Sequence, residues 1–166
     1  MHRGDTLQAI LARLADESQG HATLWRGSSP QCRDIDVLVP DAHVATVCRV
    51  LAAAGFSPPG SRPWGGWDPP DRSIPPIDIM PAGRWPARYQ PVAGVLSRRV
   101  THGPLPVAAS EDRLLVFAGD ALAGRELRKL SARAAAVVAE DPSSPERAHV
   151  VARRHGLLGH HRLLMQ

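Results

Sequence analysis

The sequence predicts an α+β fold: a short mixed β-sheet backed by helices, followed by a helical C-terminal portion. Two observations carry this prediction. Strand-like segments fall between residues 21 and 107, and from residue 110 onward the apolar pattern is helical. An order with strands first and helices last is typical of α+β proteins. We therefore divide the chain into a core, residues 1–109, and a C-terminal helical portion, residues 110–166, packed on that core.

The composition is that of an ordinary globular protein. Of 166 residues, 43% are hydrophobic and 22% are charged, which argues against collagen-like, coiled-coil and wholly disordered chains. No run approaches about 18 apolar residues, so we expect no membrane-spanning helix. The charged start is unlike a secretory signal, and two cysteines are too few for a disulfide framework. A cytoplasmic protein is therefore expected.

The first part of the chain alternates helices and strands. Apolar residues at helical spacing predict a helix over 5–17, with Asp5 as its N-cap. A short strand is expected over 21–26, and the clearest strand of the chain covers 34–39. A second helix is expected over 41–55, because an acidic cap precedes it and a glycine ends it.

The remainder changes from strands to helices. Residues 57–76 are rich in proline, glycine and tryptophan. They predict either an irregular loop or a broken hairpin, because proline cannot donate a hydrogen bond within a central sheet. Residues 77–80 predict another short strand, and residues 100–107 one or two edge strands. Helices are expected over three further segments, 110–123, 125–140 and 146–155.

Two aspartates, Asp34 and Asp36, stand two residues apart on the clearest strand. Side chains alternate along a strand, so both carboxylates point to one face while Ile35, Val37 and Val39 point into the core. Neighbouring carboxylates repel each other unless a cation lies between them, and their oxygens suit Mg²⁺. The alternative is that both side chains simply face solvent.

A third carboxylate, Asp78, lies between two isoleucines on a strand that can pair with the first. Three carboxylates from two strands can hold two divalent ions about 4 Å apart, which activate an attacking oxygen and stabilise a leaving one. We therefore assign Asp34, Asp36 and Asp78 as catalytic residues and metal ligands, and we expect two Mg²⁺ ions.

A glycine-serine turn, Gly27-Ser28-Ser29, separates the first two strands. Glycine lets backbone N–H groups approach phosphate oxygens, and the serine hydroxyl adds a donor. Arg26 and Arg33 flank this turn and can neutralise phosphate, although Arg33 can instead pair with an aspartate. An anion cradle beside a metal site is what a nucleoside triphosphate (NTP) requires, so we expect an NTP as co-substrate.

These segments resemble the polymerase-β-type nucleotidyltransferase superfamily, and within it the small bacterial antibiotic and minimal nucleotidyltransferases. The resemblance rests on Leu24-Trp25-Arg26-Gly27-Ser28, Asp34-Ile35-Asp36-Val37 and Ile77-Asp78-Ile79. It covers residues 20–80 and is weaker over 105–158. It implies a nucleotidyltransferase fold with a catalytic core over residues 1–109.

The resemblance also implies roles for the residues. Asp34 and Asp36 would bind both metal ions, and Asp78 would bind the catalytic one and help to deprotonate the acceptor. Gly27 with Ser28 would grip the triphosphate. The implied reaction transfers a nucleoside monophosphate from an NTP to a hydroxyl of an antibiotic-like small molecule or a macromolecule, and releases pyrophosphate.

Other hypotheses remain open. The protein can be a toxin–antitoxin nucleotidyltransferase that acts on tRNA or on a partner protein. It can also be a non-catalytic binding module of the same fold, although three intact aspartates argue against this. A homodimer would complete the site of so small an enzyme.

Basic residues at helical spacing form a stripe near the C-terminus, Arg125, Arg128, Lys129 and Arg133. The stripe either contacts triphosphate or an RNA backbone, or is a solvated helix face opposite an apolar one that includes Leu127. Lys129, the only lysine of the chain, and Arg125 are the candidate nucleotide-binding residues.

Three tryptophans, Trp64, Trp67 and Trp85, stand in predicted loops near Asp78. They can stack on a base or on an acceptor ring. We expect at least two of them to be structural instead, because only two phenylalanines and one tyrosine are available to share the core.

Overall fold

The computed structural model describes residues 3–26, 33–159 and 162. The chain forms two compact units, Met1–Trp85 with Arg99–Val107 and Pro86–Arg98 with Ala108–Gln166. The predicted α+β class is confirmed. The first unit contains a six-stranded mixed sheet and an N-terminal helix, and the second contains three C-terminal helices.

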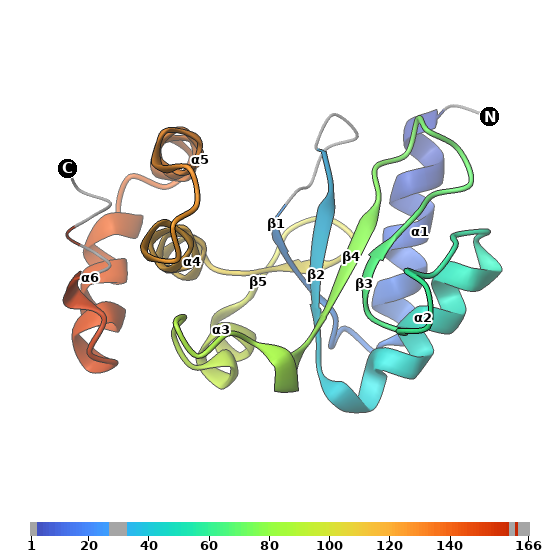
Figure 1. The fold of residues 1–166 in the computed structure, drawn as a ribbon, viewed down its shortest axis with the longest axis horizontal. Helices are drawn as coiled ribbons and strands as arrows, with labels where there is room; N and C mark the ends of the chain where they lie inside the picture. Colours follow the sequence, from blue (N-terminus) through green and yellow to red (C-terminus); the bar gives the residue numbers. More distant parts are fainter. Residues whose placement is uncertain (1–2, 27–32, 160–161, 163–166) are drawn as a thin grey trace. The chain divides into compact units, whose positions relative to one another are not determined.

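The sheet of the first unit has the strand order β3-β4-β2-β1-β6-β5 (Figure 1). Its centre is a parallel pair, β2 (Ile35–Val39) and β4 (Ile77–Pro81), and β1 (Thr23–Arg26) runs antiparallel to β2. The edges are short strands: β3 (Gly65–Trp67) beside β4, and the hairpin of β5 (Val100–Thr101) and β6 (Pro106–Val107) beside β1.

Two helices cover one face of this sheet. α1 (Arg3–Glu17) and α2 (Val44–Ala53) lie beside each other in Figure 1. Their apolar stripes join the inward-facing residues of the central strands in a single core, which includes Leu7, Leu14, Val47, Leu51, Ile35, Val37, Ile77 and Ile79. This packing follows the predicted alternation, because Ile35 and Val37 face the helices. The side chains of Asp36 and Asp78 therefore belong to the second face.

Most predicted elements of the first unit are confirmed, with differences at their ends. α1 begins at Arg3, so Asp5 lies inside the helix and its assignment as the N-cap was wrong. A 3₁₀ turn, Asp41–His43, precedes α2, and the N-cap of α2 is His43, so the assignment of Asp41 as its cap was wrong. Residues 57–76 combine both interpretations, because the short strand β3 pairs antiparallel with β4 while most of the remaining segment is turns and irregular loop.

The second unit contains α3 (Val92–Arg98), α4 (Ser110–Leu122), α5 (Leu127–Glu140) and α6 (Ser144–Arg154). The three C-terminal helices confirm the sequence prediction, whereas the short helix α3 was not predicted. Buried residues of α4, α5 and α6 form a separate core around Leu115, Phe117, Leu130, Val137 and Val151. Leu127, which we expected on the apolar face of α5, is exposed. None of the described helices is long and apolar enough to cross a membrane.

Candidate active site

A row of charged residues crosses the second face of the sheet. Asp36 of β2 lies directly beside Asp78 of parallel β4, in the same register. On its other side, Asp36 faces Arg26 of β1. Asp78 in turn pairs with Gly66 of the edge strand β3, and the space where a side chain at Gly66 would stand is open. The two carboxylates predicted to meet from separate strands are therefore neighbours.

An irregularity in β1 brings Arg26 into this row. Leu24 pairs with Val37 and belongs to the core, and regular alternation would direct Arg26 to the same face. The register shifts between the two residues, so that Arg26 pairs with Asp36 instead. Such bulges re-aim side chains at functional positions. Arg26 Nε lies 3.0 Å from Asp36 Oδ2, and its guanidinium stacks 4.1 Å from the ring centre of Trp25.

The carboxylates of the row are held against their preferred charge state. Burial raises the pKa of Asp36 to about 6, and Asp34 and Asp78 add to the rise while Arg26 opposes it. Burial and the charge of Asp34 also raise the pKa of the half-buried Asp78. Burial is the largest cause for both groups, and Arg26 opposes the rise without cancelling it, so a further cation would stabilise the charged carboxylates.

Asp34 lies next to the row and outside it. It directly precedes β2, is partly buried, and affects the pKa of both Asp36 and Asp78 through its charge. Within the described ranges, however, no three His, Cys, Asp or Glu side chains gather closely enough to hold one metal ion. The convergence of all three aspartates on shared ions therefore stays a prediction.

The predicted anion cradle consists of the Gly27-Ser28-Ser29 turn and the two arginines that flank it. Gly27, Ser28 and Ser29 lie outside the described residues, so their assignment as triphosphate-binding residues stays a prediction. Arg26 immediately precedes them at the end of β1, and Arg33 is exposed.

Lys129 belongs to the second unit. It is exposed on α5 and lies 2.7 Å from Glu126, in an ion pair three residues apart. Arg125 precedes the helix and lies 3.6 Å from the buried carboxylate of Asp120. Both residues that we proposed for nucleotide binding therefore have acidic neighbours. The rest of the basic stripe, Arg128 and Arg133, is exposed.

A pocket of about 860 Å³ opens beside Asp78 in the first unit. Val44 and Met80 provide apolar surface, and Trp64, Arg84 and Asp41 line other parts of it. Asp34 and Asp36 do not line it, so Asp78 is the member of the predicted trio that a molecule in this pocket would meet. The volume is in the range of pockets that bind metabolite-sized ligands.

The prediction that at least two of the three tryptophans are structural is confirmed, and none of the three is exposed. Trp67 is buried in the core on β3. Trp85 meets the buried Trp25 edge to face, with 5.4 Å between ring centres. Trp64 packs partly against the core and lines the pocket, with the Arg84 guanidinium 4.3 Å from its ring centre.

Two pocket residues were missed by the sequence argument. Asp41 accepts a hydrogen bond from the backbone N–H of Gly83 at 3.0 Å. A Cβ on Gly83 would stand 2.5 Å from the same carboxylate, so only glycine fits there without moving Asp41. Arg84 adjoins this glycine. The pairing joins residues about forty positions apart, and neither periodicity nor a local motif indicates it.

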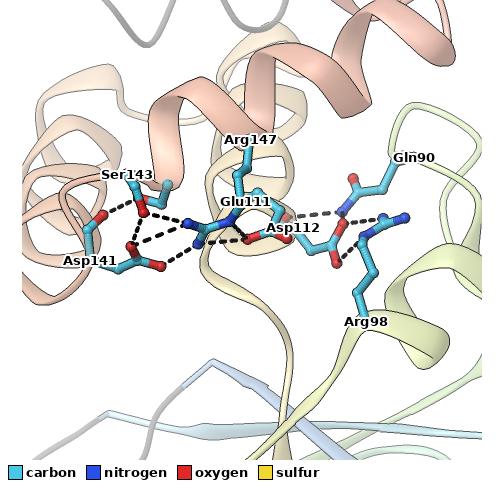
Figure 2. A network of polar contacts seen from close by, with 8 residues as sticks. Gln90, Arg98, Glu111, Asp112, Asp141, Ser143 and Arg147 are labelled. Carbon is cyan, nitrogen blue, oxygen red and sulfur yellow. Dashed lines mark hydrogen bonds and ion pairs between the residues drawn. The ribbon is translucent and has the colours of Figure 1, made fainter.

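A second group of buried charges lies in the other unit (Figure 2). Asp112 of α4 accepts hydrogen bonds from Arg98 Nε at 3.1 Å and from Gln90 Nε2 at 3.1 Å. Its neighbour Glu111 accepts a hydrogen bond from Arg147 Nε at 3.1 Å. Arg147 also forms an ion pair with the more exposed carboxylate of Asp141. Burial raises the pKa of Asp112, with Arg98 and Gln90 opposing. Here each buried carboxylate has its own arginine.

Comparison of the chain with protein-family models, with curated proteins and with solved structures finds no match.

Proposed function

We propose that this protein is a metal-dependent nucleotidyltransferase of the polymerase-β type. It would transfer a nucleoside monophosphate from an NTP to a hydroxyl of a small-molecule or macromolecular acceptor. The observation that carries the proposal is the side-by-side placement of Asp36 and Asp78 on two parallel strands, with the charge of Asp34 acting on both. The α+β class of the chain agrees with a nucleotidyltransferase fold, which is part of the same proposal.

The donor set fits a hard divalent cation. Carboxylate oxygens are the ligands that Mg²⁺ prefers, and a cation between Asp36 and Asp78 would favour their charged forms, which burial and the acidic neighbours disfavour. Asp36 and Asp78 would hold the ion, and the charge of Asp34, which acts on both, would add to its attraction. When bound, Mg²⁺ supplies neutralising charge for the phosphates of the substrate.

The chain's own residues supply the rest. Arg26, already at the carboxylates, immediately precedes Gly27–Ser29 and would neutralise the triphosphate there. Asp78 faces the pocket and would accept the proton of an acceptor hydroxyl. The hydroxyl oxygen then bonds to the α-phosphorus, the bond from that phosphorus to the bridging oxygen breaks, and pyrophosphate leaves.

One observation favours a second candidate, a non-catalytic module of the same fold. The Arg26 guanidinium lies against Asp36, where it provides positive charge without a metal ion. Such a module would bind a partner, such as the toxin or antitoxin of a two-component system, or a second copy of the chain. A catalytic protein requires Arg26 to share Asp36 with the cation, and a binding module does not.

Calorimetry with ATP, GTP, CTP and UTP, each with Mg²⁺, separates the two. The informative variant is Asp36→Asn, which keeps the shape of the side chain and removes its charge. Asp16→Asn, an exposed acidic residue on α1, is the matched control. We expect at least one NTP to bind the wild type and the control, and Asp36→Asn to weaken binding at least about tenfold. Equal heats for all three proteins would contradict the proposal.

A further inference from the structure

The pocket beside Asp78 contains a cationic stacking surface. The guanidinium of Arg84 lies 4.3 Å from the centre of the Trp64 ring, and that of Arg62 lies 5.1 Å from it. Trp64 packs partly against the core, which holds the indole in place. A guanidinium fixed over an indole presents a flat, charged surface, and aromatic rings stack on such surfaces.

The charge of this surface is not neutralised locally. Among residues 3–26, 33–159 and 162, no carboxylate forms an ion pair with Arg84 or Arg62, and both side chains are exposed. The acidic wall of the pocket is different. Asp41 already accepts the backbone N–H of Gly83. The lining of the pocket therefore includes the guanidinium of Arg84 and the carboxylate of Asp78, and Arg62, which does not line the pocket, adds a second guanidinium over the same indole.

We propose that this pocket binds a nucleotide unit, an aromatic base that carries a phosphate, as the acceptor of the transfer reaction. The base would stack on Arg84 where that residue covers Trp64, and the phosphate would pair with Arg84 and Arg62, away from Asp78. A hydroxyl of the sugar would then lie toward Asp78. The volume of about 860 Å³ accommodates such a unit. This inference rests on the proposed function, because it gives Asp78 its role.

The strand order supports an acceptor rather than the NTP in this pocket. The predicted triphosphate-binding residues follow β1, which pairs with β2 on the side away from β4. The pocket lies at the opposite end of the charged row, where β4 meets β3 and where Trp64 and Gly65 line it. Asp36 and Asp78 stand between the two ends. A donor at one end and an acceptor at the other place the reacting atoms over the carboxylates.

Binding measured without NTP or Mg²⁺ tests the inference apart from catalysis. The probes are AMP, adenosine, inorganic phosphate and a six-residue oligoadenylate, with spermidine as a cationic probe. The variant is Arg84→Gln, and the matched control is Arg49→Gln, an exposed arginine on α2 that does not line the pocket. We expect AMP to bind the wild type and the control. Arg84→Gln should weaken AMP about tenfold, and adenosine and phosphate alone should each bind more weakly than AMP.

Further measurements distinguish a free nucleotide from the end of an RNA strand, and stacking from charge. Tighter binding of the oligoadenylate than of AMP identifies the end of an RNA strand as the acceptor, and the reverse identifies a free nucleotide; both support the inference. Arg84→Lys keeps the charge and loses the planar surface, so it should bind AMP more weakly than the wild type. Wild-type affinity in Arg84→Lys would overturn the stacking geometry.

The two proposals fail in different ways. If AMP binds Arg84→Gln as it binds the wild type, or if spermidine binds better than AMP, the nucleotide pocket is wrong, whatever the calorimetry with NTP gives. If Arg84→Gln loses AMP while Asp36→Asn leaves Mg²⁺–NTP binding intact, the pocket survives as a nucleotide site but the acceptor role is overturned together with the proposed function.

Discussion

The two units treat buried acidic side chains in different ways. In the first unit, the charge of Asp34 acts on both Asp36 and Asp78, and Arg26, which pairs with Asp36, opposes the rise in the pKa of both. In the second unit, Asp112 has Arg98 and Gln90 (Figure 2). Glu111 and Asp120 are also buried, and each has arginine contacts of its own.

The difference distinguishes two uses of the same side chain. A buried carboxylate with its own arginine satisfies its hydrogen bonds and fixes the packing of the elements that carry the pair. In the first unit, burial and acidic neighbours raise the pKa of Asp36 and Asp78 despite Arg26, and such an arrangement is expected where a ligand stabilises the charged carboxylates. We therefore interpret the second network as structural and the row on the sheet as functional.

The largest effect should follow from removing an arginine of the second unit. Arg98→Met leaves Asp112 buried with only Gln90 as its side-chain partner, and we expect a loss of about 3 kcal/mol in the free energy of unfolding. Urea denaturation measures it. Lys129→Met, which breaks the exposed pair with Glu126, is the control and should cost less than about 1 kcal/mol. Equal losses would show that burial does not set the importance of these pairs.

In the first unit, by contrast, we expect the removal of a charged side chain to raise the free energy of unfolding. The folded protein keeps a proton on Asp36 up to about pH 6, whereas the unfolded chain releases it near pH 4. The free energy of unfolding therefore falls as pH rises through this interval. Asp36→Asn should remove this decline.

The same substitution has a consequence above the interval. At pH 8, after allowing for the lost pairing with Arg26, we expect Asp36→Asn to raise stability by about 1 kcal/mol. Denaturation at pH 4 and at pH 8 with both proteins measures the contribution of Asp36 together with its coupling to Asp34 and Asp78. A clear loss of stability in the variant at pH 8 would make the row structural, as in the second unit.

The sequence predicts the first unit well because its signals are local. Alternation placed Asp36 on the face opposite Ile35 and Val37, and apolar spacing placed the helices that cover that core. The neighbouring register of Asp36 and Asp78 was expected only from the similarity of their flanking residues, and the structure gives it.

Features that depend on pairing between distant segments could not be predicted. The bulge that turns Arg26 toward Asp36 is a property of the register of two strands and leaves no local pattern. The contact of Asp41 with Gly83 and that of Trp64 with Arg84 are likewise tertiary. In the second unit, Asp112 and Glu111 look like an ordinary acidic first turn of a helix until their arginines are located.

The smallest effect is expected at Asp141, which shares Arg147 with the buried Glu111 and so allows a buried and a more exposed partner of one arginine to be compared. Arg147 binds the buried Glu111 and also Asp141, whose pKa it lowers to about 2. Because the pKa of Asp141 is depressed, its contribution is present above about pH 4 and is lost as pH falls toward 2. Solvent screens a pair at this exposed position, so Asp141→Asn should leave the denaturation midpoint at pH 7 almost unchanged. Glu111→Gln, which alters the buried partner of the same guanidinium, should lower it clearly. If the two variants respond alike, the arginine rather than the burial of its partner decides stability, and the contrast between the two units must be drawn from Arg26 and Arg98 alone.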